Sequence, residues 1–151
     1  MERINNEFDL TLPEGFALLS PEELAKIYRT SAPHTVGYRK EENGDFVILS
    51  WRRSFSLSLR FSDLRSAMHR VQSQVAHSYQ NKEYVFHEYL ERECNGIHLY
   101  GFSFSFQSVR GKVNATVFTF KGKKHYYSLE FYPLEGKGED LLDPLLSSLR
   151  A

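Results

Sequence analysis

Only one cysteine is present among the 151 residues, which excludes an internal disulfide and a cysteine-rich zinc site. Long hydrophobic runs are also missing, and none approaches the roughly 20 residues of a membrane-spanning helix. The 19 basic and 19 acidic residues cancel, so the net charge argues against nucleic acid and anionic membranes as partners. The first residues lack the apolar segment of a signal peptide, and we therefore expect a single cytoplasmic domain over residues 1–151.

Aromatic residues, by contrast, are abundant at 15% of the chain, and many lie between Tyr84 and Tyr132. In this segment Asn95-Gly96 separates two alternating runs, and both residues accept the positive φ of a tight hairpin turn. The turn predicts an antiparallel β-meander in which Cys94 pairs with Ile97. Counting outward from it, and from turns at Arg110-Gly111 and 121–123, gives the remaining pairs: Tyr89 with Phe102, His87 with Phe104, Val85 with Phe106, Phe104 with Val117, Phe106 with Ala115, Gly101 with Phe120, and Phe118 with His125 or Tyr127.

Side chains alternate along a strand, so the residues of the meander divide between two faces. The first, called the inner face, would carry Phe86, Leu90, Ile97, Leu99, Gly101, Phe118, Phe120, Tyr127, Leu129 and Phe131. The second, called the aromatic face, would carry Val85, His87, Tyr89, Tyr100, Phe102, Phe104, Phe106, Val117, Tyr126 and Tyr132. Both faces are apolar, so both need cover.

Three helices are predicted around the meander. Ser20-Pro21-Glu22-Glu23 has the residues of a capping box and opens a short helix to about Arg29. A long helix over 63–79 carries Leu64, Val71 and Val75 on one stripe, and a last helix begins near Asp143 or one turn earlier. We expect the long and last helices to cover one face of the meander, and the short helix and early strands to cover the other.

The remaining strands are predicted at 8–12, 35–40 and 46–51. The segment from Arg52 to Phe61 is ambiguous, because its apolar and polar residues alternate but no turn residue separates it from the preceding strand. It either prolongs that strand or forms an extended approach to the long helix, and we favour the approach.

This order of elements predicts an α+β fold and resembles the PsbP-like fold. The resemblance rests on Leu12-Pro13-Glu14-Gly15-Phe16, the long helix, the Asn95-Gly96 hairpin and the run from Tyr126 to Phe131 before the last helix. Photosystem extrinsic proteins, a Ran-binding import factor and small bacterial domains share that fold. The resemblance implies a scaffold that binds partners, usually without catalysis, although a fold does not fix a function.

Signals for catalysis or metal binding are weak. The run from His87 to Glu91 is similar to a zinc-protease signature, but the second histidine is missing and the residues lie on a predicted strand. Cys94 has no evident basic partner, so we interpret it as a structural thiol. The basic residues Arg110 and Lys112 should lie at the opposite end of a strand from Lys121, Lys123 and Lys124. We therefore predict no enzymatic activity, no metal and no cofactor.

Two groups of residues are candidate binding sites. The first is the exposed part of the aromatic face: Tyr89, Tyr100, Phe102, Phe104, Tyr126 and Tyr132. The second is Trp51 with Arg52 and Arg53, extended by Arg60, Arg65 and Arg70, because tryptophan with arginine is typical of interface hot spots. The alternatives are a sheet fully covered by helices and solvated arginines around a core tryptophan.

We interpret the chain as a protein-interaction module, such as an adaptor, a chaperone or an immunity-type protein. The expected partner is another protein, and a homodimer through the aromatic face is an alternative arrangement. The second functional hypothesis is a binder of an apolar small molecule between sheet and helix, which a closed cavity near His87 and Glu91 would favour.

Overall fold

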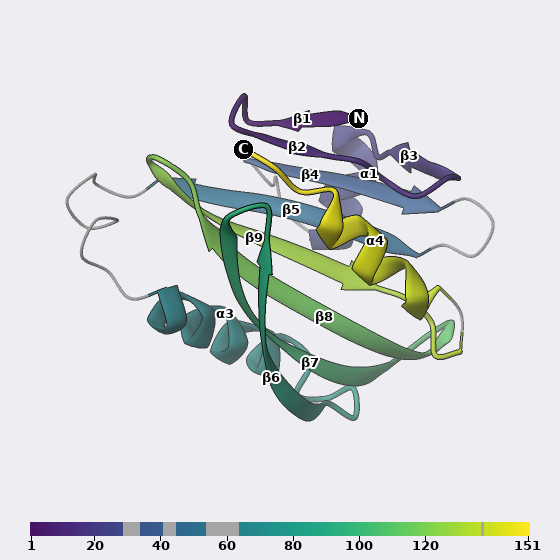
Figure 1. Cartoon of the computed structure of the whole chain (residues 1–151). Coiled ribbons are helices and arrows are strands. Elements are labelled where there is room, and N and C mark those ends of the chain that lie inside the picture. Colours follow the sequence, from purple (N-terminus) through teal and green to yellow (C-terminus); the bar gives the residue numbers. More distant parts are fainter. Residues whose placement is uncertain (29–33, 41–44, 54–63, 137) are drawn as a thin grey trace.

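Two antiparallel sheets and three helices make up the part of the chain that the computed structural model describes, which is residues 1–28, 34–40, 45–53, 64–136 and 138–151 (Figure 1). The main sheet has seven strands in the order β3 (Phe16–Leu18), β4 (Thr35–Lys40), β5 (Phe46–Arg53), β9 (His125–Tyr132), β8 (Gly111–Lys121), β7 (Ile97–Ser108) and β6 (Val85–Cys94). A small sheet pairs β1 (Glu2–Ile4) with β2 (Phe8–Leu10). The helices are α1 (Pro21–Tyr28), α3 (Leu64–Ser78) and α4 (Leu142–Ser147), which follows a 3₁₀ turn at Glu139–Leu141. The predicted α+β class is confirmed.

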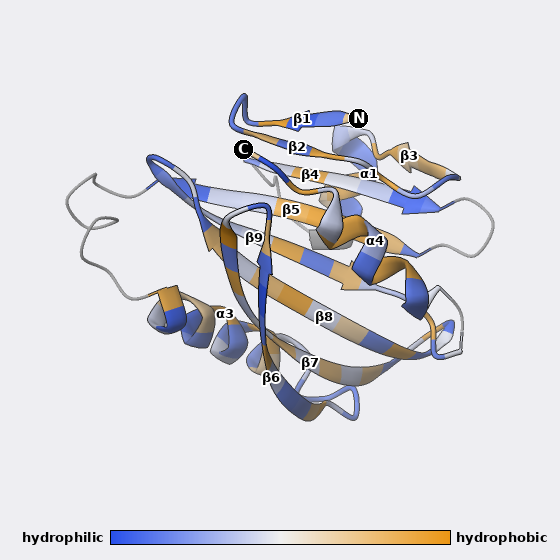
Figure 2. Ribbon diagram, viewed as in Figure 1, coloured by the Kyte–Doolittle hydropathy of each residue, from blue (hydrophilic) through white to orange (hydrophobic). Residues whose placement is uncertain are grey.

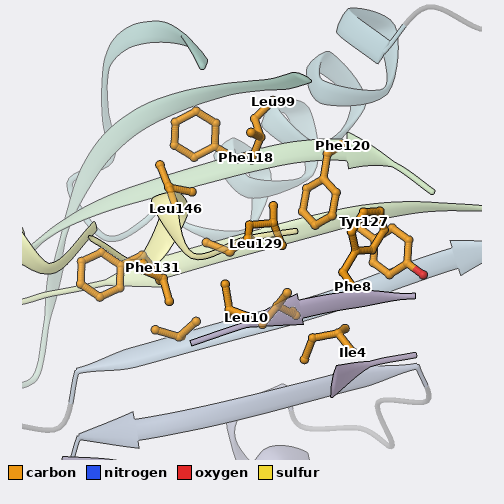
Figure 3. Packing of buried hydrophobic residues seen from close by; sticks show 14 of the residues in the cluster. Ile4, Phe8, Leu10, Leu99, Phe118, Phe120, Tyr127, Leu129, Phe131 and Leu146 are labelled. Carbon is orange, nitrogen blue, oxygen red and sulfur yellow. The ribbon is translucent and has the colours of Figure 1, made fainter. Parts of the chain in front are cut away.

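The inner face of the main sheet is covered by α4 and the β1–β2 hairpin. Their apolar residues, among them Ile4, Phe8 and Leu146, pack on Phe118, Phe120, Leu129 and other residues of the sheet (Figure 3). Phe8 meets the rings of Phe120 and Tyr127 edge-on, at centroid distances of 5.1 and 4.9 Å. This packing gives the fold its larger core.

The opposite face is covered by α3 and, toward β4, by α1. Met68 and Val75 of α3 are buried in one cluster with Phe102, Phe104 and Ile48. Leu19 and Leu24 at the start of α1 lie against Gly37 on the same side of the sheet as Ile48. The prediction that α3 and α4 share a face is therefore wrong. Figure 2 shows hydrophobic residues along the strands and hydrophilic residues at the turns and along much of α3.

The Asn95-Gly96 hairpin has the predicted register near its turn, where Cys94 pairs with Ile97 and Tyr89 with Phe102. Farther out the prediction is wrong, because His87 is an extra residue in a β-bulge between Phe86 and Glu88. Phe86 therefore pairs with Phe104 and Val85 with Ser105, and the side chain of Phe86 joins the aromatic face.

In the next two hairpins the strand pairing differs from the prediction by an even number of residues, two in the first and two or four in the second. Phe104 pairs with Ala115, and Phe106 with Val113, because Ser108 organises the turn by accepting a hydrogen bond from the Arg110 N–H at 3.1 Å. In the turn after β8, Phe118 pairs with Leu129. Shifts of an even number of residues leave each side chain on its predicted face, so from Leu90 onward the face assignment is confirmed.

Gly101 lies opposite Phe118 rather than Phe120. A Cβ atom at this position would lie 2.1 Å from the Val117 carbonyl oxygen and 2.8 Å from the Phe118 ring, so only glycine fits where β7 bends over β8. The tip of the β6–β7 hairpin reaches α4, where the Asn95 side-chain amide donates hydrogen bonds to the carbonyl oxygens of Ser147 and Leu149, at 3.1 and 2.8 Å. The sheet is therefore curled, with one edge fastened to the helix on its inner face.

The capping box of α1 is confirmed by reciprocal hydrogen bonds of 3.2 Å between Ser20 and Glu23. Strands at 35–40 and 46–51 and helices at 64–78 and 142–147 are also confirmed, with β5 extending to Arg53. The strand predicted at 8–12 ends at Leu10, and it pairs with β1. Neither β1 nor β3 was predicted from the sequence. Residues 54–61 of the ambiguous segment, and the expected end of the first helix at Arg29, lie outside the described residues.

Residues near the two ends of the chain are paired through their backbones. The Asp9 N–H donates to the Arg150 oxygen at 2.7 Å, and the Arg150 N–H donates to the Asp9 oxygen at 3.0 Å. The Thr11 N–H also donates to the Ser148 hydroxyl at 2.9 Å. The β1–β2 hairpin and the segment after α4 therefore cover the inner face as one unit.

Candidate functional site

The centre of the aromatic face is buried beneath α3, so it is not a free surface. Phe102 and Phe104 are 0% exposed and Tyr132 is 8% exposed. The expectation that these three residues form part of an open patch is wrong, because the apolar stripe of α3 packs directly on them. Only residues at the two flanks of α3 reach the surface, and these flanks differ in chemistry.

The flank beside β6 and β7 is closed by contacts between helix and sheet. The Arg65 guanidinium lies over the Tyr100 ring at 5.0 Å, and the Tyr89 hydroxyl donates a 2.9 Å hydrogen bond to the Gln72 side-chain oxygen. The His69 ring also meets the Tyr89 ring edge-on at 5.2 Å. Tyr89 is 53% exposed, but its polar group is already engaged in holding α3.

The flank beside β5 and β9 forms a groove of about 300 Å³ between α3 and the sheet. We call it the arginine groove, and it is lined by Ser50, Trp51, Arg52, Ala67, Arg70, Val71, Gln74, Tyr126 and Ser128. Strand pairing explains part of this set, because Arg52 lies opposite Tyr126 and Ser50 opposite Ser128. Arg70 and Gln74, one helical turn apart, supply the other wall.

The polar groups of the arginine groove are incompletely partnered. Arg52 and Arg70 are exposed, and neither has a carboxylate within ion-pair distance in the part of the chain that the structure describes. The Tyr126 hydroxyl is buried, yet it has no hydrogen-bond partner among the described residues. Because α3 contains no acidic residue, its wall of the groove offers no negative charge to offset the arginines. The groove therefore combines positive charge with a tyrosine hydroxyl that has no partner among the described residues.

Trp51 and Arg53 alternate with Arg52, so their side chains belong to the other face of β5. The Trp51 ring lies 6.2 Å from the Tyr127 ring and packs against the inner-face core. Arg65 is on the far flank of α3, so the predicted arginine cluster is divided by the helix; Arg60 lies outside the described residues. The structure brings together Arg52, Arg70 and Tyr126, which the sequence analysis had assigned to two separate candidate sites.

Other candidate residues do not assemble a catalytic or metal site. The His87 ring lies 3.0 Å from the Ser105 hydroxyl, whereas the Glu91 carboxylate lies 4.0 Å from Arg65, so His87 and Glu91 do not converge. Burial raises the pKa of the Cys94 thiol, which opposes its use as a nucleophile. Within the described ranges, no group of three His, Cys, Asp or Glu residues could hold a metal ion. None of the helices described is long and apolar enough to cross a membrane.

Ser50, Gln74 and Ser128 were not predicted to be groove residues. Strand alternation and helical spacing assign each of them to a face, but nothing in the sequence shows that these faces meet. Their contribution depends on the position of α3 across β5 and β9, which is a tertiary feature.

Several solved structures share this fold, among them the following three. Cyanobacterial PsbP (CyanoP) from Synechocystis sp. PCC 6803 superposes with a TM-score of 0.65 at 11% identity, over 96% of this chain and 92% of that one. LpqN of Mycobacterium tuberculosis, which is described as involved in cell envelope biogenesis, gives 0.58 at 13% identity, over 95% of this chain and 83% of its own. A protein of Bacteroides thetaiotaomicron VPI-5482 gives a TM-score of 0.64 at 9% identity. The match covers 96% of this chain but only 45% of that protein.

No protein-family model matches the chain, and no curated protein matches it in sequence. The predicted PsbP-like fold is confirmed by the structural similarity. At these identities the similarity shows the fold alone, and the function has to be argued from the surface of this chain.

Proposed function

We propose that this chain is a non-catalytic protein-interaction module whose arginine groove binds an acidic segment of a partner protein. The observation that carries the proposal is the pair Arg52 and Arg70, which flank the groove without carboxylate partners in the described chain. Arginine binds carboxylates through two parallel N–H donors, and it is enriched at protein interfaces. A partner carboxylate between the two guanidinium groups would satisfy both.

The buried Tyr126 hydroxyl supports the same assignment. A buried hydroxyl without a partner is unfavourable, and a hydrogen bond from or to a bound segment would remove this penalty. Ser50 and Ser128 place two further hydroxyls along the groove, and Val71 with Ala67 provides apolar contact. A peptide that alternates acidic and apolar side chains fits this lining better than a purely apolar ligand does.

The hypothesis of an apolar ligand between sheet and helix has less support. The space between α3 and the sheet is filled by side chains such as Met68, Val75 and Phe104, each at most 7% exposed. The groove at its flank is lined by two arginines and two serines besides its apolar residues, which does not suit a purely apolar occupant.

The proposal is tested with the double variant Arg52→Glu/Arg70→Glu. A short fluorescent peptide rich in glutamate and leucine serves as the probe, and its binding is followed by fluorescence anisotropy at several salt concentrations. Reversing both charges should weaken binding by about tenfold or more, because like charges would then face each other. Both arginines are exposed, so the fold should survive the change.

The matched control is Lys26→Glu/Lys82→Glu, which alters the net charge equally at two exposed positions outside the groove. This control should bind the peptide with wild-type affinity. Equal weakening in both variants would refute the groove and indicate non-specific attraction to positive charge. Native mass spectrometry of the gently purified protein then identifies the natural companion, and a bare homodimer in place of a second protein would overturn the proposal.

The cytoplasmic location and the single domain over residues 1–151 stay predictions. Fractionation of cells that produce the untagged protein tests the location, because an envelope protein would be absent from the cytoplasmic fraction. The groove would recognise an acidic segment in either compartment.

A further inference from the structure

A second cavity, of about 740 Å³, lies where three turns and the last residue of the chain meet. The turns belong to the hairpins β1–β2, β6–β7 and β8–β9, which come together at one end of the molecule in Figure 1. The volume is within the range of roughly 300–1,000 Å³ that is usual for small-molecule sites. The cavity is separate from the arginine groove and shares no lining residue with it.

The interior of this cavity is largely apolar. Phe8, Ile97 and Leu64 line it, together with the backbone of two glycines, Gly96 and Gly122. Phe8 and Leu64 are 4% and 7% exposed, so both belong to the buried part of the lining. Such a lining can accept an alkyl chain or a ring.

The rim of the cavity is positively charged. Among the described lining residues, Arg3, Lys121, Lys123 and Lys124 are basic and Glu7 is acidic, and Arg3 is paired with Asp9 at 3.1 Å. Lys123 and Lys124 are exposed at the tip of the β8–β9 turn. Positive charge beside an apolar cavity favours a ligand that has an anionic head and an apolar body.

Glu7 contributes one negative charge to this rim, fewer than the three lysines contribute in positive charge, and its carboxylate also holds the turn. One oxygen accepts the Lys123 backbone N–H, and the other accepts the Tyr127 hydroxyl proton at 2.5 Å. A side chain on Gly122 would collide with the same carboxylate, at 2.2 Å from its Oε1. The backbone of the β8–β9 turn is therefore held against the β1–β2 hairpin, which fixes the points where the Lys123 and Lys124 side chains leave the turn.

We propose that this cavity binds an amphiphilic anion, with a phosphate or carboxylate head held by Lys123 and Lys124 and an apolar part lying against Phe8 and Ile97. The ligand enters as a monomer, because the cavity is bounded by three turns. Binding here is independent of the arginine groove, so an experiment can refute either binding site without affecting the other.

Isothermal titration calorimetry with dodecyl phosphate, kept below its micelle-forming concentration, tests the proposal. Inorganic phosphate and dodecanol are titrated in parallel as probes of charge alone and of apolar contact alone. Wild-type protein should bind dodecyl phosphate most tightly of the three. Lys123→Ala/Lys124→Ala should weaken it by about tenfold or more, as expected for the loss of charge-assisted hydrogen bonds.

Two controls make the result specific. Lys26→Ala/Lys82→Ala removes the same charge elsewhere, and Arg52→Glu/Arg70→Glu disrupts only the groove; both should leave dodecyl phosphate binding unchanged. Equal binding of dodecyl phosphate to the lysine variant and the wild type would overturn the proposal. Binding to phosphatidylglycerol vesicles without binding of the monomer would also overturn it, because a membrane surface and not the cavity would then be recognised.

Discussion

Asn95 offers the sharpest test of how the curled sheet is held. Its φ of 52° needs a residue that tolerates the left-handed region, and its side-chain amide donates to the carbonyl oxygens of Ser147 and Leu149. Asn95→Asp keeps the size and the tolerance for positive φ, but it replaces the two N–H donors with an acceptor. This substitution therefore separates the hydrogen bonds from the turn conformation.

The expected loss follows from the two bonds. Each hydrogen bond of this kind contributes about 0.5–1.5 kcal/mol net, so Asn95→Asp should lower the free energy of unfolding by about 1–3 kcal/mol. With a urea m-value of about 2 kcal/mol/M, the midpoint should fall by about 0.5–1.5 M. Asn95→Ala should lose about 1 kcal/mol more, since alanine disfavours the left-handed conformation.

Urea unfolding followed by circular dichroism measures these differences, with Asn81→Asp as the matched control. Asn81 is exposed and makes no side-chain hydrogen bond within the described residues, so its variant should match the wild type. Hydrogen exchange should also accelerate in α4 and at the hairpin tip of Asn95→Asp, but not in α1. If Asn95→Asp and Asn81→Asp have the same midpoint, the amide does not fasten the hairpin and the reasoning is refuted.

Three further predictions concern the sheet and its cores. Gly101→Ala should lower the free energy of unfolding in urea by about 1–3 kcal/mol, because the new Cβ would lie 2.1 Å from a backbone oxygen of β8. A variant as stable as the wild type would show that β7 does not bend as described. Phe104→Arg should abolish cooperative unfolding, because it buries an unpaired charge at a fully buried position, whereas Phe104→Leu should remain folded; a cooperative Phe104→Arg variant would place Phe104 at the surface. Burial, with the Glu7 carboxylate beside it, raises the pKa of Tyr127 to about 12. A raised pKa favours the protonated phenol in the fold, so this stability is complete below about pH 10 and is lost as the pH rises toward about 12. Tyr127→Phe should therefore lose less stability across that window, and parallel urea midpoints for wild type and variant would contradict the assignment.

Local chemistry explains why several elements could be predicted. The Asn95-Gly96 turn and the Ser20–Glu23 capping box each act through residues that are adjacent or three apart, so a short stretch of sequence specifies them. Alternation then assigned most side chains of the meander to the correct face, even where the predicted strand pairing was wrong by two or four residues.

The errors arose where distant residues decide the outcome. The bulge at His87 moves Phe86 to the other face, and no turn residue in the sequence indicates it. The turn after β8 is held by Glu7, a residue 116 positions away from Lys123. Because both faces of the meander are apolar, its sequence could not show which face α3 would cover.

The candidate site was predictable only in part, for the same reason. Arg52, Arg70 and Tyr126 were recognised as candidates from their residue types, but they were placed in two different sites. Their meeting depends on the pairing of β5 with β9, which are separated by about half of the chain length, and on the position of α3 above that pair. The burial of Phe102 and Phe104 depends on the same placement.

The backbone pairing of Asp9 with Arg150 has a consequence for the order in which the chain folds during translation. The β1–β2 hairpin is synthesised well before α4, yet Ile4, Phe8 and Leu10 share a core with Leu145, Leu146 and Leu149. Contacts of such long sequence separation form late and slow the folding of a domain. The inner-face core therefore cannot be completed until the segment from Leu145 to Arg150 has been synthesised and has left the ribosome. Until then the apolar side chains of the β1–β2 hairpin lack part of their cover.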